Sequence, residues 1–449
     1  MEIKMNRLVI VLSLILGFSN VLYAKNKAER EQWFMDLGFG MFIHWSFDSQ
    51  VGAVISHSMA GASKDYLDRF VDELPQTFNP KHFDPEEWAV LAKLAGMKYV
   101  VFTSKHHSGF CMWNTKTTPF NVMNTPCKRD LMKDVIEAFR KQGIAIGIYF
   151  SPEDFHYLYR HDLPIGRLQH PLHYPENNEG LMALDKAQLK EILTDYGKID
   201  IIFFDGPAEG LKEYAWQLHP DIVVTRGEME TPEQKLPDRP VSGPWEANFT
   251  MGTDWQYKPT NDPHKTGTQI INMLIETRAK GGNLLLNVGP KPNGEIQIEQ
   301  DALLREVALW NLVNTEAVHG IKPWQLIKEG NFWFTMSKDE TTVYVFVPGG
   351  ESWPYGTRKD FIFKTLKADD HTKISILGYG SELVEYREGF DAAIYSVPTP
   401  LGLVVSAVNG HRLYTNNKWP NPVVFKIENV TYRPLDEARE KRSGIDGAK

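Results

Sequence analysis

One carboxylate in this sequence stands where a catalytic group would be expected. Asp205 directly follows the short apolar run 201–204 and is followed by Gly206-Pro207. A run this short and aromatic, ended by two turn-forming residues, predicts a buried parallel strand. Barrel enzymes place catalytic groups at the C-terminal ends of such strands, but an Asp there can also cap the next segment. The segment alone leaves both interpretations open.

Three other predicted strands end in side chains that could bind a polar ligand. These are His44 with Trp45, His106 with His107 and nearby Trp113, and Tyr149. At one rim of a barrel they would form a polar pocket with aromatic walls. For His44 taken alone, a hydrogen-bonded core histidine is the better interpretation.

The adjacent pair His106-His107 also raises the question of a metal. Side chains of neighbouring residues on an extended chain point to opposite sides, so both rings cannot easily face one ion. No carboxylate or cysteine accompanies the pair at ligand spacing. The sequence therefore predicts no metal site.

Glycoside hydrolysis is one reaction that such a pocket could perform, and it needs a second carboxylate to protonate the leaving oxygen. The segment after the predicted strand 222–225 offers Glu228, Glu230, Glu233 and Glu246. At least two of these should be ordinary solvated surface. Arg226, which ends the strand, could hold a sugar hydroxyl or tune a carboxylate, with a plain salt bridge as the alternative.

The elements that must position these residues alternate between strand and helix. Strands are predicted at 39–45, 99–103, 144–151, 200–204, 222–225 and 283–288, and helices at 85–95, 131–142, 184–196 and 266–279. This alternation predicts a parallel sheet. No glycine-rich dinucleotide turn follows the first strand, which favours a closed barrel over an open sheet. Eight clean strand–helix pairs cannot be counted, so the barrel should be irregular.

The pattern changes from about residue 332, where short strands are separated by turns rich in Gly, Pro and Asn. Strands at 332–335, 342–347, 373–377, 403–407 and 423–427 predict an antiparallel β-sandwich. The predicted fold class is thus α/β: a (β/α)8-like TIM barrel over 25–325, then a C-terminal antiparallel β-sandwich over 330–433 and a polar tail over 434–449.

The N-terminus and the composition limit where the protein acts and what it binds. Lys4 and Arg7 precede an apolar run over 8–18, and the pattern predicts a signal peptide over 1–24 and an exported protein, periplasmic or secreted. No later segment predicts membrane insertion. A net charge of −8 argues against binding nucleic acid. Cys111 and Cys127 could form a disulfide or remain two unpaired buried thiols.

Six stretches, taken in order, resemble glycoside hydrolase family 29, the retaining α-L-fucosidases. They are Phe39-Gly40-Met41-Phe42-Ile43-His44-Trp45, Lys105-His106-His107 with Gly109-Phe110, Gly147-Ile148-Tyr149-Phe150-Ser151, Phe204-Asp205-Gly206, Trp245-Glu246, and Gly281-Gly282-Asn283-Leu284-Leu285-Leu286-Asn287-Val288-Gly289-Pro290. They span about residues 33–296 and are highly specific as a set. The resemblance implies a (β/α)8-like barrel followed by a β-sandwich, double displacement with retention, and no cofactor.

The resemblance also implies roles for the site residues and a substrate, a fucosylated oligosaccharide or glycoconjugate. Asp205 is expected to be the nucleophile. His44, His106, His107 and Tyr149 are expected to contact the sugar hydroxyls, with Arg226 close to the acid/base loop. The strand-end pattern adds Trp45 and Trp113 as expected substrate contacts. For the acid/base, Thr231-Pro232-Glu233 matches a Thr-x-Glu pattern of the family, while Trp245-Glu246 is the better preserved landmark; we favour Glu233 and keep Glu246 as the alternative.

The sequence departs from the family pattern at three places. Ser46 replaces a usual Gly, and Ser108 replaces a usual Asp. The usual Glu-Trp substrate contact after the first strand is missing from the segment 55–66. These departures leave two alternatives to a fucosidase: a glycosidase of the same mechanism on a related sugar such as an α-L-galactoside, or a non-catalytic glycan-binding protein. Nothing in the sequence predicts the oligomeric state.

Overall fold

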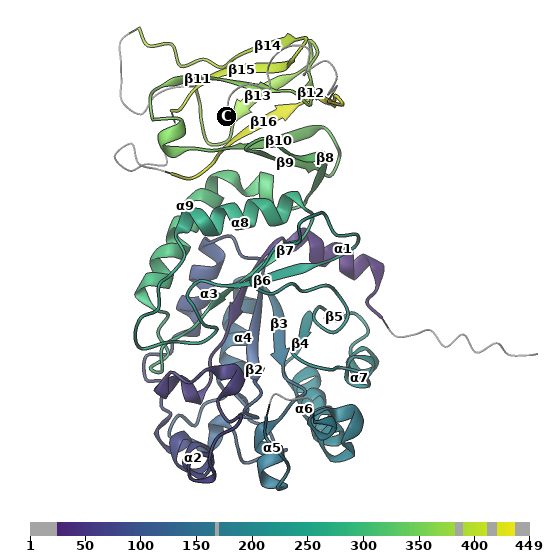
Figure 1. The fold of residues 1–449 in the computed structure, drawn as a ribbon, viewed down its shortest axis with the longest axis vertical. Helices are drawn as coiled ribbons and strands as arrows, with labels where there is room; N and C mark the ends of the chain where they lie inside the picture. The colour runs from purple at the N-terminus through teal and green to yellow at the C-terminus, as the bar shows by residue number, and fades with distance from the viewer. Residues whose placement is uncertain (1–24, 167–169, 382–388, 411–419, 436–449) are drawn as a thin grey trace, which may run out of the picture.

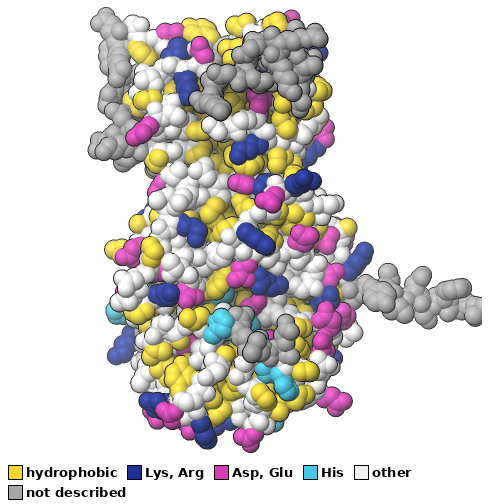
Figure 2. Space-filling view, in the orientation of Figure 1, with side chains coloured by type: hydrophobic (Ala, Val, Ile, Leu, Met, Phe, Trp, Pro, Cys, Tyr) yellow, Lys and Arg dark blue, Asp and Glu magenta, His cyan; other side chains and the backbone are white. Residues whose placement is uncertain are grey.

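The computed structural model describes residues 25–166, 170–381, 389–410 and 420–435. The predicted signal peptide over 1–24 and all but the first two residues of the predicted polar tail over 434–449 lie outside the described residues. Among the described residues, no helix combines the length and apolar character that a membrane span needs. On the face shown in Figure 2, acidic and basic side chains are interspersed, and no large basic patch stands out.

A parallel sheet forms the centre of the N-terminal part, with helices around it (Figure 1). Its strands are β1 (Phe39–Ile43), β2 (Tyr99–Lys105), β3 (Ala145–Phe150), β4 (Ile201–Phe204), β5 (Val223–Val224), β6 (Glu246–Thr250) and β7 (Asn283–Val288). Their order is β5-β4-β3-β2-β1-β7-β6. Nearly every residue of these strands is buried, as expected where helices cover a parallel sheet. The predicted barrel-like sheet is confirmed, with seven strands in the described part of the chain in place of eight.

Nine α-helices occur among the described residues, and several begin where the sequence supplies a cap. They are α1 (Ala28–Leu37), α2 (Lys64–Asp68), α3 (Pro85–Leu94), α4 (Leu131–Lys141), α5 (Phe155–Arg160), α6 (Glu179–Asp195), α7 (Leu211–Leu218), α8 (Gly267–Ala279) and α9 (Ile298–Val318). The Asp84 carboxylate accepts the first free N–H groups of α3, which also begins with proline. Thr266 and Gln269 form a capping box at the start of α8.

The strand–helix alternation stops between β5 and β6. Residues 225–245 contain no helix. Instead, this segment pairs with the edge of β6 through isolated bridges, Glu230 with Trp245 and Glu233 with Asn248. The acidic loop therefore lies in the gap between the two edge strands of the sheet. The strand β6 itself was not predicted from the sequence.

Aromatic rings fill the interior of the barrel. Phe42, Tyr99, Tyr149 and Phe203, from four neighbouring strands, belong to one buried cluster. A Cβ atom at Gly40 would lie 2.4 Å from the Tyr99 ring. Only glycine therefore lets β1 pass this ring, which explains the Phe-Gly step in the first apolar run.

The C-terminal part is an antiparallel β-structure. Its strands are β8 (Ile321–Glu329), β9 (Phe332–Ser337), β10 (Thr342–Val347), β11 (Arg358–Phe363), β12 (Leu366–Lys367), β13 (Lys373–Ile376), β14 (Tyr395–Thr399), β15 (Gly402–Val408), β16 (Val423–Glu428) and β17 (Thr431–Tyr432). They form a five-stranded sheet, β13-β16-β10-β9-β8, a three-stranded sheet, β11-β15-β14, and the pair β12-β17. The five predicted strands are confirmed. Because β8 already pairs with β9, this part begins at Ile321, before the predicted start at residue 330.

The helices α8 and α9 lie between the barrel and the antiparallel sheets (Figure 1). The Trp310 indole on α9 donates a hydrogen bond to the Pro422 carbonyl at 2.8 Å. Lys426 on β16 pairs with Glu316 on α9 at 2.7 Å. The C-terminal part thus packs on the helical exterior of the barrel.

Candidate active site

A cavity of about 270 Å³ lies at the C-terminal ends of the barrel strands. Its lining residues are Phe42, His44, Val54, Ser56, His57, His106, Tyr149, Phe203, Asp205, Arg226, Glu233, Asn248, Asp254 and Trp255. All of them belong to the barrel. Because pockets for drug-sized ligands usually begin at about 300 Å³, this cavity suits a single sugar ring better than a long glycan.

Asp205 lies in the wall of this cavity and is held on both carboxylate oxygens. The Tyr149 hydroxyl donates to Oδ2 at 2.6 Å, and Arg226 Nη1 donates to Oδ1 at 2.7 Å. Burial alone would raise the pKa of Asp205, but the charges of His107 and Arg226 hold it well below its usual range. Burial and the neighbouring Asp205 also raise the pKa of Tyr149, so its phenol stays a hydrogen-bond donor. Asp205 is therefore an ionised carboxylate at neutral pH.

Glu233 reaches the same guanidinium from the loop between β5 and β6. Arg226 Nη2 donates to Glu233 Oε2 at 3.1 Å, and Arg226 Nε donates to the Thr231 hydroxyl at 3.1 Å. The Glu233 side chain is 45% exposed, compared with 24% for Asp205. Two carboxylates on the two terminal nitrogens of one guanidinium lie side by side. A retaining glycosidase needs two carboxyl groups close together, and Arg226 holds both of these at one cavity.

His44 presents a hydrogen-bond acceptor to the cavity. Its Nδ1 lies 2.6 Å from Asn287 Oδ1. The amide nitrogen of Asn287 donates to the Trp255 carbonyl at 2.6 Å, which fixes the amide orientation. The Asn287 oxygen must then accept from His44 Nδ1–H, so that Nε2 keeps its lone pair. Burial lowers the pKa of His44 to about 4, and the ring is neutral at neutral pH.

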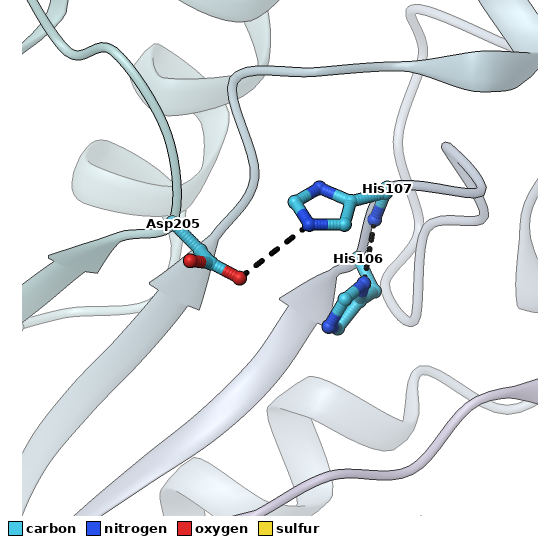
Figure 3. Close-up of side chains that lie close together, drawn as sticks. All are labelled: His106, His107 and Asp205. Carbon is cyan, nitrogen blue, oxygen red and sulfur yellow. Dashed lines mark hydrogen bonds and ion pairs between the residues drawn. The ribbon is translucent and has the colours of Figure 1, made fainter. Parts of the chain in front are cut away.

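The two adjacent histidines converge on Asp205 (Figure 3). His107 Nε2 lies 3.5 Å from Asp205 Oδ2, while His107 Nδ1 contacts the Ser151 hydroxyl at 2.5 Å. The Nδ1 atom of His106 accepts the backbone N–H of His107 at 2.8 Å, so its Nε2 carries the proton. The ring of His106 stacks on Tyr149 at 4.9 Å. His106 therefore offers a donor where His44 offers an acceptor.

The expectation that His106 and His107 point to opposite sides is wrong. The strand β2 ends at Lys105, so the pair lies beyond the extended backbone on which that argument depends. One nitrogen of each ring and an Asp205 oxygen lie within 4.8 Å of one another, which could in principle hold a metal ion. A cation there would compete with Arg226, which already binds the Asp205 carboxylate. The donor set is better suited to sugar hydroxyls.

Four aromatic rings form one side of the cavity. The ring of Phe42 lies 5.9 Å from Tyr149, 5.1 Å from Phe203 and 5.9 Å from Trp255. Trp255 also lies 4.9 Å from His44. This wall offers apolar contact to one face or edge of a sugar ring and adjoins the polar groups around Asp205.

Four predicted site residues are absent from the cavity lining. His107 is one of them, and it contacts Asp205 without lining the cavity itself. Trp45 packs against Phe78, Phe83 and Trp88 in the core. Trp113 is buried, and its indole donates to Glu191 at 3.0 Å on helix α6. Each indole thus contacts a helix of the outer layer, α3 for Trp45 and α6 for Trp113. The structure thus corrects the prediction that these two indoles contact the substrate.

Glu246 is the fourth predicted site residue outside the cavity lining. It begins β6, so it lies at the opposite end of the strand from the cavity, fully buried. It accepts the Tyr99 hydroxyl at 2.5 Å. Burial raises the pKa of Glu246 to about 7. This carboxyl has a pKa suitable for an acid/base but no access to a substrate, which leaves Glu233 as the acid/base candidate.

A buried charge cluster supports the loop that carries the histidine pair. Lys105, the last residue of β2, lies 2.7 Å from Asp185 and 3.4 Å from Asp154, and all three side chains are almost fully buried. Asp154 also caps α5. The cluster thus ties the end of β2 to the elements that follow β3. Nearby Cys111 and the more exposed Cys127 are free thiols, so the alternative of a disulfide between them is wrong.

Sequence reasoning missed several cavity residues. Ser56 and His57 come from a short 3₁₀ helix over Ile55–His57, and Asn248, Asp254 and Trp255 come from β6 and the loop after it. The adjacent acidic and tryptophan residues Asp254-Trp255 could have been recognised in the sequence as a candidate sugar-binding pair. The pair was overlooked because β6 itself was not predicted.

Several known proteins resemble this chain. The profile of the family described as Alpha-L-fucosidase matches residues 19–316. Tissue alpha-L-fucosidase of Mus musculus is 30% identical over 414 residues, which cover 82% of this chain and 87% of the mouse protein. Alpha-L-fucosidase isoenzyme 1 from Paenibacillus thiaminolyticus superposes with a TM-score of 0.69 at 26% identity, covering 90% of this chain and 99% of that one. A GH29 alpha-L-fucosidase from Bacteroides thetaiotaomicron gives a TM-score of 0.69 at 25% identity, covering 90% and 96%.

Proposed function

The chain belongs to the alpha-L-fucosidase family, and we propose that it releases L-fucose from the end of fucosylated glycans, with Asp205 as nucleophile and Glu233 as acid/base. The observation that carries the assignment of residues is the pair of carboxylates held by Arg226 in one cavity. No cofactor enters this mechanism.

In the first step, an Asp205 oxygen attacks the anomeric carbon of the sugar. The bond from that carbon to the aglycone oxygen breaks, and Glu233 gives its proton to the departing oxygen. The result is an ester between Asp205 and the fucosyl group. The low pKa of Asp205 keeps this carboxylate ionised for the attack and makes it a good leaving group afterwards.

In the second step, water attacks the same carbon from the side that the aglycone left. Glu233 takes one proton of this water, and the ester bond to Asp205 breaks. Two successive inversions give net retention, and both carboxyl groups return to their starting states. The position of Glu233 in the more exposed wall agrees with its contact to aglycone and water.

The cavity also supports a deoxy sugar. His44 and His106 supply one acceptor and one donor for hydroxyl groups. The aromatic wall of Phe42, Phe203 and Trp255 gives apolar contact, which suits the methyl group that fucose carries in place of the hydroxymethyl of galactose. An α-L-galactoside would have to place a hydroxyl against these rings.

The test is hydrolysis of an aryl α-L-fucoside by the purified enzyme, with the aryl α-L-galactoside alongside. Proton NMR at early times should show the α-anomer of fucose as the first product. Asp205→Gly should abolish hydrolysis, and azide should restore turnover to give the β-fucosyl azide. Glu233→Gln should lower turnover by a factor of about 10²–10⁴ with poor leaving groups and much less with activated ones. Binding of fucose without any turnover would instead support the non-catalytic alternative.

We also propose that the protein is exported. The support is the basic N-terminus followed by the apolar run over 8–18. N-terminal sequencing of the protein recovered from outside the cytoplasm should begin near Lys25. Recovery of the full-length chain from the cytoplasm alone would contradict export.

A further inference from the structure

A third carboxylate lines the cavity, and the mechanism does not use it. Asp254 follows β6 and precedes Trp255, and both side chains face the space that Asp205 and Glu233 line. The Asp254 side chain is 12% exposed. One oxygen, Oδ1, accepts the backbone N–H of Trp255 at 2.7 Å. The other oxygen, Oδ2, has Lys258 as its nearest ion-pair partner. The Lys258 Nζ atom lies 3.8 Å from Oδ2, which is beyond hydrogen-bonding distance. Oδ2 is therefore available as an acceptor.

The loop around Asp254 is held in place from both sides. On the N-terminal side, Asp262 Oδ1 accepts the backbone N–H of Thr253 at 2.7 Å. On the C-terminal side, the Trp255 carbonyl accepts from Asn287 at 2.6 Å, and Gln256 donates to the Ala53 carbonyl at 2.6 Å. The carboxylate is thus fixed before a substrate arrives, as a binding group should be.

The neighbours of Asp254 point to the part of the substrate that it reaches. The Trp255 ring lies 4.9 Å from His44, just beyond the end of β1, and 5.9 Å from Phe42 inside that strand. Asp254 therefore approaches the sugar from the side on which His44 offers its acceptor. The segment 55–66, in contrast, contributes only Ser56 and His57 to the lining, and Val54 just before it is apolar.

We propose that Asp254 binds a hydroxyl group of the sugar and that Trp255 packs beside the sugar. These two residues would replace the Glu-Trp substrate contact that is missing from the segment 55–66. The proposal rests on the proposed function. Asp254 takes no part in bond breaking; its charged hydrogen bond adds binding and discriminates among sugars by their hydroxyl groups. A carboxylate lost from one loop is in this way replaced from another loop of the same rim.

The experiment compares the wild-type enzyme with Asp254→Asn and a control, Asp262→Asn. The Asn side chain keeps an acceptor for the Trp255 N–H but loses the charge at Oδ2. Asp262→Asn removes a charge from the same loop and weakens the acceptor for the Thr253 N–H without changing the cavity lining. We measure KM and kcat for an aryl α-L-fucoside, and inhibition constants for L-fucose and its 3-deoxy and 4-deoxy analogues.

We expect Asp254→Asn to raise KM and the inhibition constant of L-fucose by about 10- to 100-fold, as for loss of a hydrogen bond to a charged group, with a smaller change in kcat. One deoxy analogue should bind the wild type and the variant equally well, which identifies the hydroxyl. Asp262→Asn should keep both constants near wild type.

Three outcomes would count against these assignments, and they are distinguishable. An active wild type whose Asp254→Asn variant keeps its KM and inhibition constants overturns the role of Asp254 alone. Equal effects of Asp254→Asn and Asp262→Asn show that Asp254 only shapes the loop, which overturns it too. A wild type that neither hydrolyses nor binds any fucoside overturns the proposed function and this assignment with it.

Discussion

Replacement of Glu246 by glutamine separates a buried structural carboxyl from a catalytic one. Glu246 is fully buried at the start of β6 and accepts the Tyr99 hydroxyl. Burial raises its pKa from 4.5 to about 7, because the ionised form loses its hydration inside the barrel. The glutamine side chain has the same shape and can still accept from Tyr99, but it never ionises. We therefore expect Glu246→Gln to keep most of the activity and to change how stability depends on pH.

The sign and size of this effect follow from the shift. Below the unfolded pKa, the carboxyl is protonated in both states and its favourable contribution is complete. As pH rises toward about 7, the unfolded chain releases the proton while the folded chain retains it, so the free energy of unfolding falls. Above the folded pKa the contribution is lost. A shift from 4.5 to about 7 corresponds to about 3 kcal/mol, at about 1.4 kcal/mol per pKa unit.

The assay is chemical denaturation of the wild type and of Glu246→Gln, followed by tryptophan fluorescence from about pH 4.5 to about pH 8.5. Other titrating groups are common to both proteins, so the difference between their midpoints isolates Glu246. A chain with two packed parts need not unfold in one step, and the comparison therefore uses the transition that exposes the barrel. Relative to glutamine, the wild type should lose about 3 kcal/mol over this range.

Two results would refute the reasoning. Parallel midpoints across the whole pH range would show that Glu246 has no raised pKa. Loss of turnover in Glu246→Gln, recovered with activated leaving groups, would make Glu246 the acid/base despite its burial. The matched variant Glu233→Gln should instead show a large loss of turnover that is recovered with activated leaving groups.

Two further predictions concern the charges around the cavity. Arg226→Gln removes the cation 2.7 Å from Asp205, so the pKa of Asp205 should rise. Because Asp205 must be ionised to attack, the acid limb of the pH profile of kcat/KM should move to higher pH. An acid limb at the wild-type pH would contradict the electrostatic role of Arg226. Lys105→Met leaves Asp154 and Asp185 buried without their cation and should lower the free energy of unfolding by about 3–5 kcal/mol. Adding Asp185→Asn removes one of the uncompensated charges and should recover part of that loss. Chemical denaturation of the single and double variants measures both free energies.

The elements that the sequence predicted well are those with a strong local signal. The strands β1 to β5 and β7 are continuous apolar runs ended by turn residues or polar groups, and the alternation that follows from them predicts the barrel. β6 was missed because it begins with a buried Glu246 and carries Asn248, two polar residues that break the apolar pattern. Helix α9 was missed for a similar reason, since its buried positions include Gln300, Asn311 and Asn314.

Site residues were likewise predicted correctly where the sequence carries a strong local signal and wrongly where it does not. Asp205, His44, His106 and Tyr149 stand at strand ends, where a rule about parallel sheets places them together. Trp45 stands one position beyond His44 and packs against Trp88 on α3. Trp113 lies well beyond the end of β2 and contacts Glu191 on α6. Sequence spacing does not show that either side chain leaves the cavity. The choice between Glu233 and Glu246 likewise needed the strand boundaries, because only these show that Glu246 begins β6 and Glu233 precedes it.

The catalytic residues lie at strand ends of the barrel, whereas some of the other cavity residues lie on its loops. The nucleophile and its partners Tyr149 and Arg226 come from the ends of three adjacent strands, so any change in their spacing would disturb the sheet itself. Asp254 and His57 lie on loops, where the chain can exchange one polar group for another without moving a strand. If Asp254 binds the sugar as proposed, the missing carboxylate in the segment 55–66 does not show that catalysis was lost. It shows instead that hydroxyl recognition moved to a different loop around an unchanged nucleophile.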